Sequence, residues 1–239
     1  SALGRLLGSR MFYCRMSVLR ESQPEEKESL ARAGWKRPAV GMSTGLTMLC
    51  SLTGEEAERL KRTSSNWRHN LKRSGHYGLR IERWNQPDPA ELSALYREME
   101  GLKSLPVQHS EAELAAMLST LGERLVMFRC LDAEGKLLAV RAAGLLGETA
   151  WDLLAAAGAN ARKVYASHAT LWALLDHCSR RGLLHYDLSG VDPIHNKGVY
   201  DFKQGTGARL VECLGEWEWA SLPGMCLAFN WVLKRRGGA

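Results

Sequence analysis

Apolar and polar residues follow two spacings along this chain, one typical of strands and one typical of amphipathic helices. Strand patterns occur at residues 11–19, 46–52, 78–84, 124–131, 136–147, 149–158 and 183–189. Helical patterns occur at residues 24–34, 54–74, 90–103, 110–122 and 163–182. A helix between two strands makes the strands parallel neighbours, whereas the three consecutive strands from 124 to 158 form an antiparallel meander. The patterns therefore predict an α/β fold with a mixed sheet flanked by helices.

The stretch NQPDP, residues 85–89, is typical of a turn or linker and divides these elements into two groups. We expect two domains, 1–84 and 85–239. An apolar stripe runs along the helix 163–182 and consists of Val164, His168, Leu171, Leu175 and Cys178. A histidine in such a stripe is more often a hydrogen-bonded core residue than a catalyst, so we interpret His168 as part of the core.

The helix predicted at 54–74 has one apolar and one basic side. Thr53 is a candidate N-cap and Gly75 a candidate end. Residues on the two sides recur at i, i+7 and i+11: Leu60, Trp67 and Leu71 on the apolar side, Lys61, Arg68 and Lys72 on the basic side. Such a basic side is either a solvated helix face or a surface that binds a polyanion.

Composition narrows the class of protein. The chain has 239 residues, of which 45% are hydrophobic and 24% charged, as expected for a globular protein. The longest apolar run is interrupted by Arg141, and no run reaches the roughly 20 residues that span a bilayer. The first ten residues lack the features of a secretory signal, so we expect a cytoplasmic protein. The six cysteines form no C-x-x-C pair, and no metal site is predicted.

Two segments near the end of the predicted sheet carry candidate chemistry. In GVYDFKQGTGA, residues 198–208, Lys203 follows two aromatic residues and precedes two spaced glycines. It is either a surface lysine at a helix end or a functional cation. Asp187 ends the last predicted strand, where we expect it to point outward at the carboxyl edge of the sheet, the edge at which α/β folds gather their sites. An aspartate there can equally cap the following turn.

The run YASHATLWALLDHCSRRGLLHYDLSGVDPIHNKGVYDFKQGTGA, residues 165–208, resembles the C-terminal domain of the Fem-type (FemABX) aminoacyl-tRNA-dependent transferases. Residues 34–84 look like the end of that family's N-terminal domain, where a strand is followed by a basic helix. The resemblance implies a GNAT-like fold with a complete C-terminal domain and an apparently incomplete N-terminal GNAT-like domain. A whole N-terminal domain would need further residues before Ser1, so either the protein is longer than this sequence or this half is reduced.

The family moves an aminoacyl group from its ester on tRNA to the amine of a peptide acceptor. Attack on an ester carbonyl builds negative charge on oxygen, which a fixed cation stabilises. By resemblance, Lys203 is this stabiliser and Phe202 its aromatic neighbour. Tyr200, Gly205 and Gly207 are expected to line the substrate pocket, where glycines let backbone approach a ligand or make a tight turn. Aminoacyl-tRNA is the donor substrate, and no cofactor is expected.

An activated ester needs only a weak base to take a proton from the incoming amine. Asp187, Asp192 and His195 are the local candidates, and their spacing does not choose among them. Asp192 is the least favoured because Asp-Pro is itself a turn signal.

Several exposed basic residues are candidates for contact with tRNA phosphates. They are Arg68, Lys72, Arg73, Arg162 and Lys163. The main alternative is an acyl-CoA-dependent GNAT enzyme, which would need glycines three and five positions after Arg162; Tyr165 and Ser167 stand there instead. A second alternative is a non-catalytic module that binds nucleic acid.

The sequence defines the acceptor substrate less well than the donor. Enzymes of the family that act on muropeptides tend to carry an arginine and a tyrosine before the second helix of the C-terminal domain, whereas residues 105–114 read LPVQHSEAEL. A peptide natural product, tethered to a carrier, fits as well as a lipid-linked peptidoglycan precursor. The C-terminal segment 223–239 joins apolar residues to a basic end, and is either a packing helix with a solvated tail or a contact with a membrane surface.

Overall fold

The computed structural model describes residue 8 and residues 11–107 and 109–235. The chain divides into two compact units, one formed by Ser1–Met48, Gly190–Tyr200 and Leu210–Ala239, the other by Leu49–Ser189 and Asp201–Arg209. Each unit combines segments that are distant in the sequence, so the units do not test the predicted domain boundary. The domains 1–84 and 85–239 stay a prediction.

The larger unit is a mixed α/β layer structure. Its elements are α3 (Glu56–Arg62), α4 (Ser65–Ser74), β3 (Arg80–Arg83), α5 (Pro89–Lys103), α6 (Glu111–Leu121), β4 (Leu125–Leu131), β5 (Leu137–Leu146), β6 (Thr149–Ala157), α7 (Ala166–Arg180) and β7 (His185–Gly190). The strand order is β7-β6-β5-β4-β3, with β2 (Leu46–Ser51) beyond β7. Strands β3 to β6 are antiparallel neighbours, and β7 is parallel to β6. The predicted mixed sheet flanked by helices is confirmed.

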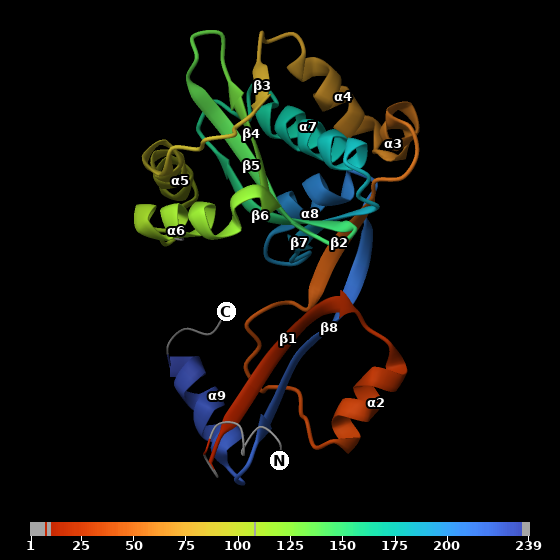
Figure 1. Ribbon diagram of the computed structural model, residues 1–239, viewed down its shortest axis with the longest axis vertical. Coiled ribbons are helices and arrows are strands. Elements are labelled where there is room, and N and C mark those ends of the chain that lie inside the picture. Colours follow the sequence, from red (N-terminus) through yellow and green to blue (C-terminus); the bar gives the residue numbers. More distant parts are fainter. Residues whose placement is uncertain (1–7, 9–10, 108, 236–239) are drawn as a thin grey trace. The chain divides into compact units, whose positions relative to one another are not determined.

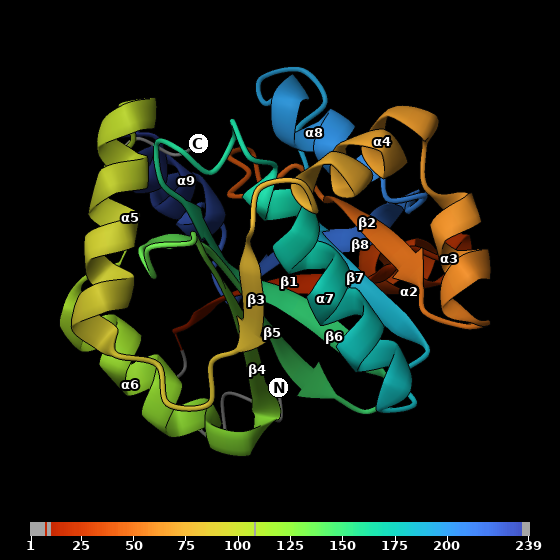
Figure 2. The ribbon, with the colours of Figure 1, turned by 90° about the horizontal axis from the view of Figure 1, so that it is seen from above.

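Helices cover both faces of this sheet. In both views α5 and α6 lie on one side of β3–β6, and α7 with α4 lies on the other (Figures 1 and 2). Val140 and Ala142 of β5 pack into the core beneath α5, with Tyr96 and Met99 from that helix. Because side chains alternate along a strand, Arg141 between them points to the opposite face.

The basic segment 54–74 is two helices, not the single helix predicted. Thr63 ends α3 in an extended conformation and the side chain of Ser64 caps α4 by accepting the Trp67 N–H. The N-cap of α3 is Glu55, so the prediction for Thr53 is wrong, whereas Gly75 ends α4 as expected. Apolar periodicity continues across the break, so it could not reveal the turn.

The smaller unit contains β1 (Tyr13–Glu21), α2 (Pro24–Arg32), most of β8 (Arg209–Ala220) and α9 (Met225–Arg235). Strands β1 and β8 pair antiparallel. The sequence patterns predict no element at 209–220. Strand β8 escapes prediction because two acidic residues, Glu216 and Glu218, occupy buried positions that ordinarily hold apolar side chains.

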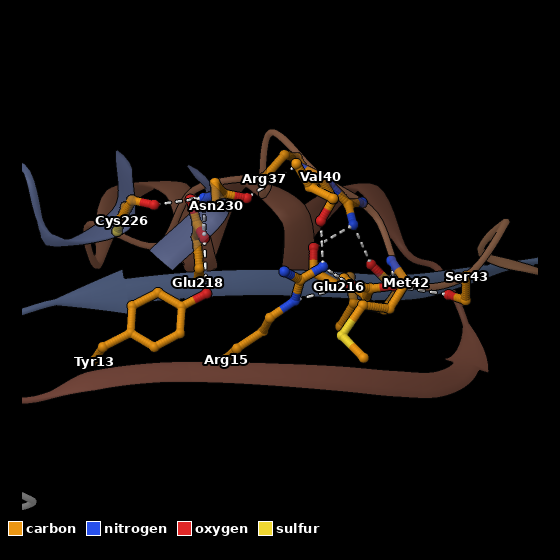
Figure 3. A network of polar contacts seen from close by, with 11 residues as sticks. Tyr13, Arg15, Arg37, Val40, Met42, Ser43, Glu216, Glu218, Cys226 and Asn230 are labelled. Atoms are coloured by element: carbon orange, nitrogen blue, oxygen red, sulfur yellow. Dashed lines mark hydrogen bonds and ion pairs between the residues drawn. The ribbon is translucent and has the colours of Figure 1, made fainter. Parts of the chain in front are cut away.

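Both buried glutamates have polar partners (Figure 3). Glu216 accepts hydrogen bonds from the Arg15 guanidinium and from the Met42 N–H at 2.8 Å. Glu218 accepts from the Tyr13 hydroxyl at 2.9 Å and from the amide of Asn230. These bonds offset the cost of removing two carboxylates from water.

Helix α8 (Lys197–Gln204) ends in a turn that packs against the α3–α4 corner. Gly207 has φ +85°, and a Cβ there would lie 2.4 Å from the Arg62 carbonyl oxygen. The Ser64 N–H donates to the Gly205 carbonyl at 2.8 Å. The break between α3 and α4 therefore makes room for this turn.

Replacing Gly207 by alanine is expected to destabilise the protein strongly. Gly78 provides the control because it has φ +62° and a Cβ at this position would meet nothing within 4 Å beyond the adjacent residues. We expect Gly78→Ala to cost about 1–2 kcal/mol from backbone strain alone, and Gly207→Ala to cost about 3 kcal/mol or more because backbone must also move. Urea unfolding measures both free energies. Equal losses would contradict the packing described here.

Candidate active site

Lys203 lies in the last turn of α8 and is buried, with 7% of its surface exposed. Its Nζ donates to the Ser189 carbonyl at 3.3 Å. Burial lowers the pKa of Lys203 to about 8; Asp152 and Asp187 oppose this shift, and Arg141 adds to it. Lys203 is therefore not a surface lysine, and its buried amine is mostly protonated at neutral pH.

A buried ion pair lies beside Lys203. The Arg141 guanidinium makes two hydrogen bonds to the Asp152 carboxylate, Nε to Oδ1 at 2.9 Å and Nη2 to Oδ2 at 2.6 Å. The Tyr186 hydroxyl donates to the same Oδ1 at 2.9 Å. All three side chains are buried. No local sequence pattern predicts this cluster, because the residues around Arg141 do not show that it meets Asp152 on the next strand.

A β-bulge produces this pairing. Arg141 stands opposite Ala155, but Ala143 stands opposite Asp152, so Leu153 is an extra residue on β6. The bulge moves Asp152 onto the face to which Arg141 points, which is a common use of bulges near functional sites.

Strands β6 and β7 pair in parallel from Thr149–His185 to Trp151–Asp187. Just beyond this pairing, Ser189 adopts a left-handed conformation with φ 62°. Its hydroxyl donates to the Asp152 carbonyl, and its own carbonyl accepts from Lys203. Ser189 thus links the strand that carries the ion pair to the catalytic candidate.

Asp187 does not point outward as predicted. It is 3% exposed, and its Oδ1 accepts the Ser189 N–H at 2.8 Å. This bond caps the following turn, which is the second of the two roles that the sequence allowed for Asp187. Because Asp187 opposes the lowering of the Lys203 pKa, it also serves as a fixed negative charge near the lysine.

Aromatic side chains surround Phe202, which precedes Lys203 in the sequence. The Phe202 ring centroid lies 5.0 Å from that of His168 and 6.2 Å from that of Trp67, and the Arg141 guanidinium lies 5.6 Å from the Phe202 ring. Burial lowers the pKa of His168 to about 4, so its imidazole is neutral at pH 7. The half-buried Phe202 joins an aromatic cluster to the ion pair.

The two glycines after Lys203 approach other parts of the chain. A Cβ on Gly205 would lie 2.8 Å from the Trp67 ring, and Gly207 contacts the Arg62 backbone. The sequence allowed Gly205 and Gly207 either to admit a ligand close to the backbone or to make a tight turn. The geometry favours the tight turn.

The predicted phosphate-binding residues differ in their surroundings. Arg68 is partly buried and donates to the carbonyls of Leu60, Lys61 and Thr63, so it holds the α3–α4 corner together. The other four residues are exposed: Lys72, Arg73, Arg162 and Lys163.

Arg73 lies against an aromatic residue at the start of α7. Its guanidinium is 4.8 Å from the ring centroid of Tyr165, and Tyr77 lies 6.3 Å from the same ring. Tyr165 is the N-cap of α7 and has φ 59°, a conformation that non-glycine residues rarely adopt. Such strain tends to occur at functional sites.

His195 and Tyr200 belong to the smaller unit. The His195 side chain is 80% exposed, and its Nδ1 lies 2.9 Å from the Asp192 carboxylate. Asp192 accepts the backbone N–H groups of His195 and Ile194, and these bonds lower its pKa. Asp192 is thus a turn residue; the roles of His195 and Tyr200 stay predictions.

Known proteins resemble this chain in sequence and in fold. The FemAB family matches residues 108–230, more than half of the chain. The sequence has no significant match among curated proteins. FemX has a similar fold, with a TM-score of 0.79 at 13% identity over 100% of this chain and 77% of that one.

Two further solved structures are similar in fold. The C-terminal DUF2156 domain of an assigned lysylphosphatidylglycerol synthetase from Agrobacterium fabrum gives a TM-score of 0.64 at 15% identity, over 100% of this chain and 76% of that one. A tandem GNAT protein from the clavulanic acid biosynthesis pathway gives 0.52 at 14%, over 93% and 67%.

The fold has a GNAT-like architecture, and the family match supports a transferase. More particularly, the chain belongs to the FemAB family, of the Fem type. Within the described residues, no helix is long and apolar enough to cross a membrane.

Lys203 is expected to titrate near pH 8. Exposed lysines titrate near 10.4, so NMR of protein labelled with ¹³C at lysine Cε should resolve one signal with a midpoint about two units lower. The Lys203→Met variant assigns the signal by its absence. A midpoint near 10.4 for the assigned signal would contradict the burial described above.

The Asp152→Asn variant should lose about 3–5 kcal/mol of unfolding free energy, because it leaves the Arg141 charge buried without its partner. It should also lower the pKa of Lys203 further, since Asp152 favours the ammonium form. Tyr186→Phe is the matched control: it keeps the ion pair and should lose about 1 kcal/mol. Urea unfolding and the same NMR titration check both. A loss from Asp152→Asn no larger than that from Tyr186→Phe would refute the role of the pair.

Proposed function

We propose that the protein is an aminoacyl-tRNA-dependent aminoacyltransferase that forms a peptide bond with the amine of a peptide-type acceptor. The observation that carries the proposal is the Lys203 ammonium, buried beside Phe202 and next to two carboxylates, in a chain of the FemAB family.

The reaction joins the acceptor nitrogen to the ester carbonyl carbon. The carbonyl oxygen gains negative charge in the tetrahedral intermediate, and the bond from carbon to the ribose oxygen then breaks. The amine loses a proton and the ribose oxygen gains one. Lys203 is the cation that stabilises the oxyanion, because charges interact strongly in a site from which water is excluded.

The pKa of Lys203 suits this role. With a pKa of about 8 the group is mostly protonated at pH 7. It is also acidic enough to give a proton to the departing ribose oxygen, since proton transfer is most effective when the donor's pKa lies near the working pH. Asp187, which belongs to the same unit as Lys203, is the proposed base for the incoming amine.

The surface at α4 and the start of α7 supports RNA as the carrier of the donor. Arg73, Tyr165 and Tyr77 combine a cation with aromatic faces. Proteins bind single-stranded nucleic acid with this combination, because bases stack on aromatic rings while cations meet phosphates. Lys72, Arg162 and Lys163 are the proposed additional phosphate contacts.

Acyl-CoA is the less favoured donor because most amides at the start of α7 already bind within the chain. A pyrophosphate binds the unpaired N–H groups at a helix N-terminus. Here the Ala166 N–H donates to the Ala161 carbonyl at 2.9 Å, and the His168 N–H to the Tyr165 carbonyl at 3.0 Å. Two of the first three amides of the helix are therefore used within the chain.

The acceptor is proposed as a peptide amine, on a lipid-linked peptidoglycan precursor or on a carrier-tethered peptide natural product. An aminoacyl-tRNA donor would place the reaction in the cytoplasm.

A donor assay tests the proposal. The purified protein is given a pool of labelled aminoacyl-tRNAs or labelled acetyl-CoA together with peptide amines, with ribonuclease in a parallel arm. We expect transfer from tRNA only, abolished by ribonuclease. Lys203→Met should lower the rate about 10²–10³-fold, as removal of an oxyanion donor does.

Lys103→Met is the control, because this exposed lysine on α5 has the same charge and lies outside the site. It should leave the rate unchanged. Transfer from acetyl-CoA that ignores ribonuclease would overturn the proposed donor, and full activity of Lys203→Met would overturn the role of the lysine.

A further inference from the structure

Helix α9 packs on the rest of the smaller unit through Asn230 and through Phe229, whose ring stacks on that of Tyr13 with the centroids 4.2 Å apart. Asn230 is the buried residue of the helix, 5% exposed. Its amide donates to the Glu218 carboxylate and to the Cys226 carbonyl, and its Oδ1 accepts the Val40 N–H at 2.9 Å (Figure 3). A surface helix ordinarily buries its apolar side, whereas the one fully buried residue of α9 is polar and several of its large apolar residues stay exposed.

The other sides of α9 carry large apolar groups toward solvent. Leu227 is 74% and Trp231 55% exposed, and they follow one another at i and i+4 on the outer face. Exposed apolar residues in this segment are Leu222, Leu227, Phe229, Trp231 and Val232. Single exposed hydrophobic residues are common, but a contiguous group on one short helix marks an interaction surface.

The charges of the segment are all positive. No acidic residue follows Glu218 in the sequence, and α9 ends in Lys234 and Arg235. The Arg235 guanidinium lies 3.8 Å from the Trp231 ring centroid. Trp and Leu beside Lys and Arg, without acids, are typical of helices that lie in the interface of an anionic bilayer.

We propose that α9 binds the surface of an anionic phospholipid bilayer, with Leu227 and Trp231 inserted among the lipids and Lys234 and Arg235 at the headgroups. The helix has 11 residues, about 16 Å in length, so it lies in the interface and does not cross the bilayer. An anionic bilayer fits better than a protein partner because every charged residue of α9 is positive. The proposal is independent of the donor and acceptor of the transferase reaction.

Flotation with vesicles tests this surface. The full chain is mixed with vesicles of phosphatidylcholine alone, or of phosphatidylcholine with phosphatidylglycerol, in low and high salt. We expect binding to the anionic vesicles, weakened by salt. The double variant Leu227→Ser, Trp231→Ser should reduce the bound fraction at least about tenfold, and Lys234→Gln with Arg235→Gln should remove the preference for anionic vesicles.

Leu146→Ser is the matched control, because Leu146 is 72% exposed at the end of β5 and is remote in sequence from α9. It should bind like the unchanged protein. Circular dichroism and thermal unfolding confirm that each variant folds. Equal vesicle binding by the α9 variants and the control would overturn the proposal. So would absence of vesicle binding together with self-association that the double variant abolishes, since α9 would then contact a second copy.

Discussion

The buried ion pair between Arg141 and Asp152 is the constraint on which the site depends. Two charges can leave water only when each satisfies the other, and here both nitrogens of the fork and the Tyr186 hydroxyl meet one carboxylate. The pair requires the bulge in β6 and fixes three neighbouring strands relative to one another. Beside this ion pair, the Ser189 hydroxyl donates to the Asp152 carbonyl and the Ser189 carbonyl accepts from the Lys203 ammonium. The position of the lysine thus follows from the pairing of the strands.

The other side of the lysine is set by the turn after α8. Gly205 and Gly207 let this turn approach the α3–α4 corner more closely than any side chain would allow. The same corner leads into α4, which carries Arg73 to the face of Tyr165. One set of contacts therefore connects the buried cation to the exposed basic and aromatic surface. This connection supports the proposal that one substrate contacts both the lysine and the exposed surface.

The sequence predicted the regular parts of the fold and one part of the site. The elements from α5 to β7 follow the apolar periodicities closely, and Lys203 with Phe202 could be singled out because a family resemblance assigns them roles. Strand β8 was missed because Glu216 and Glu218 are buried, so its pattern looks polar. The break at Thr63 and Ser64 depends on a contact with Gly205. The pairing of Arg141 with Asp152 depends on a β-bulge. Both are long-range features that no local spacing encodes.

The central claim is that Lys203 contacts the carbonyl at which transfer takes place. The most direct measurement is a crystal structure of the protein with a short RNA that carries an amino acid on its terminal ribose through a stable amide in place of the ester. The account predicts that the Lys203 Nζ lies about 3 Å from the carbonyl oxygen, with the RNA along α4 and the start of α7. A carbonyl remote from Lys203, or RNA bound at another surface, would contradict it.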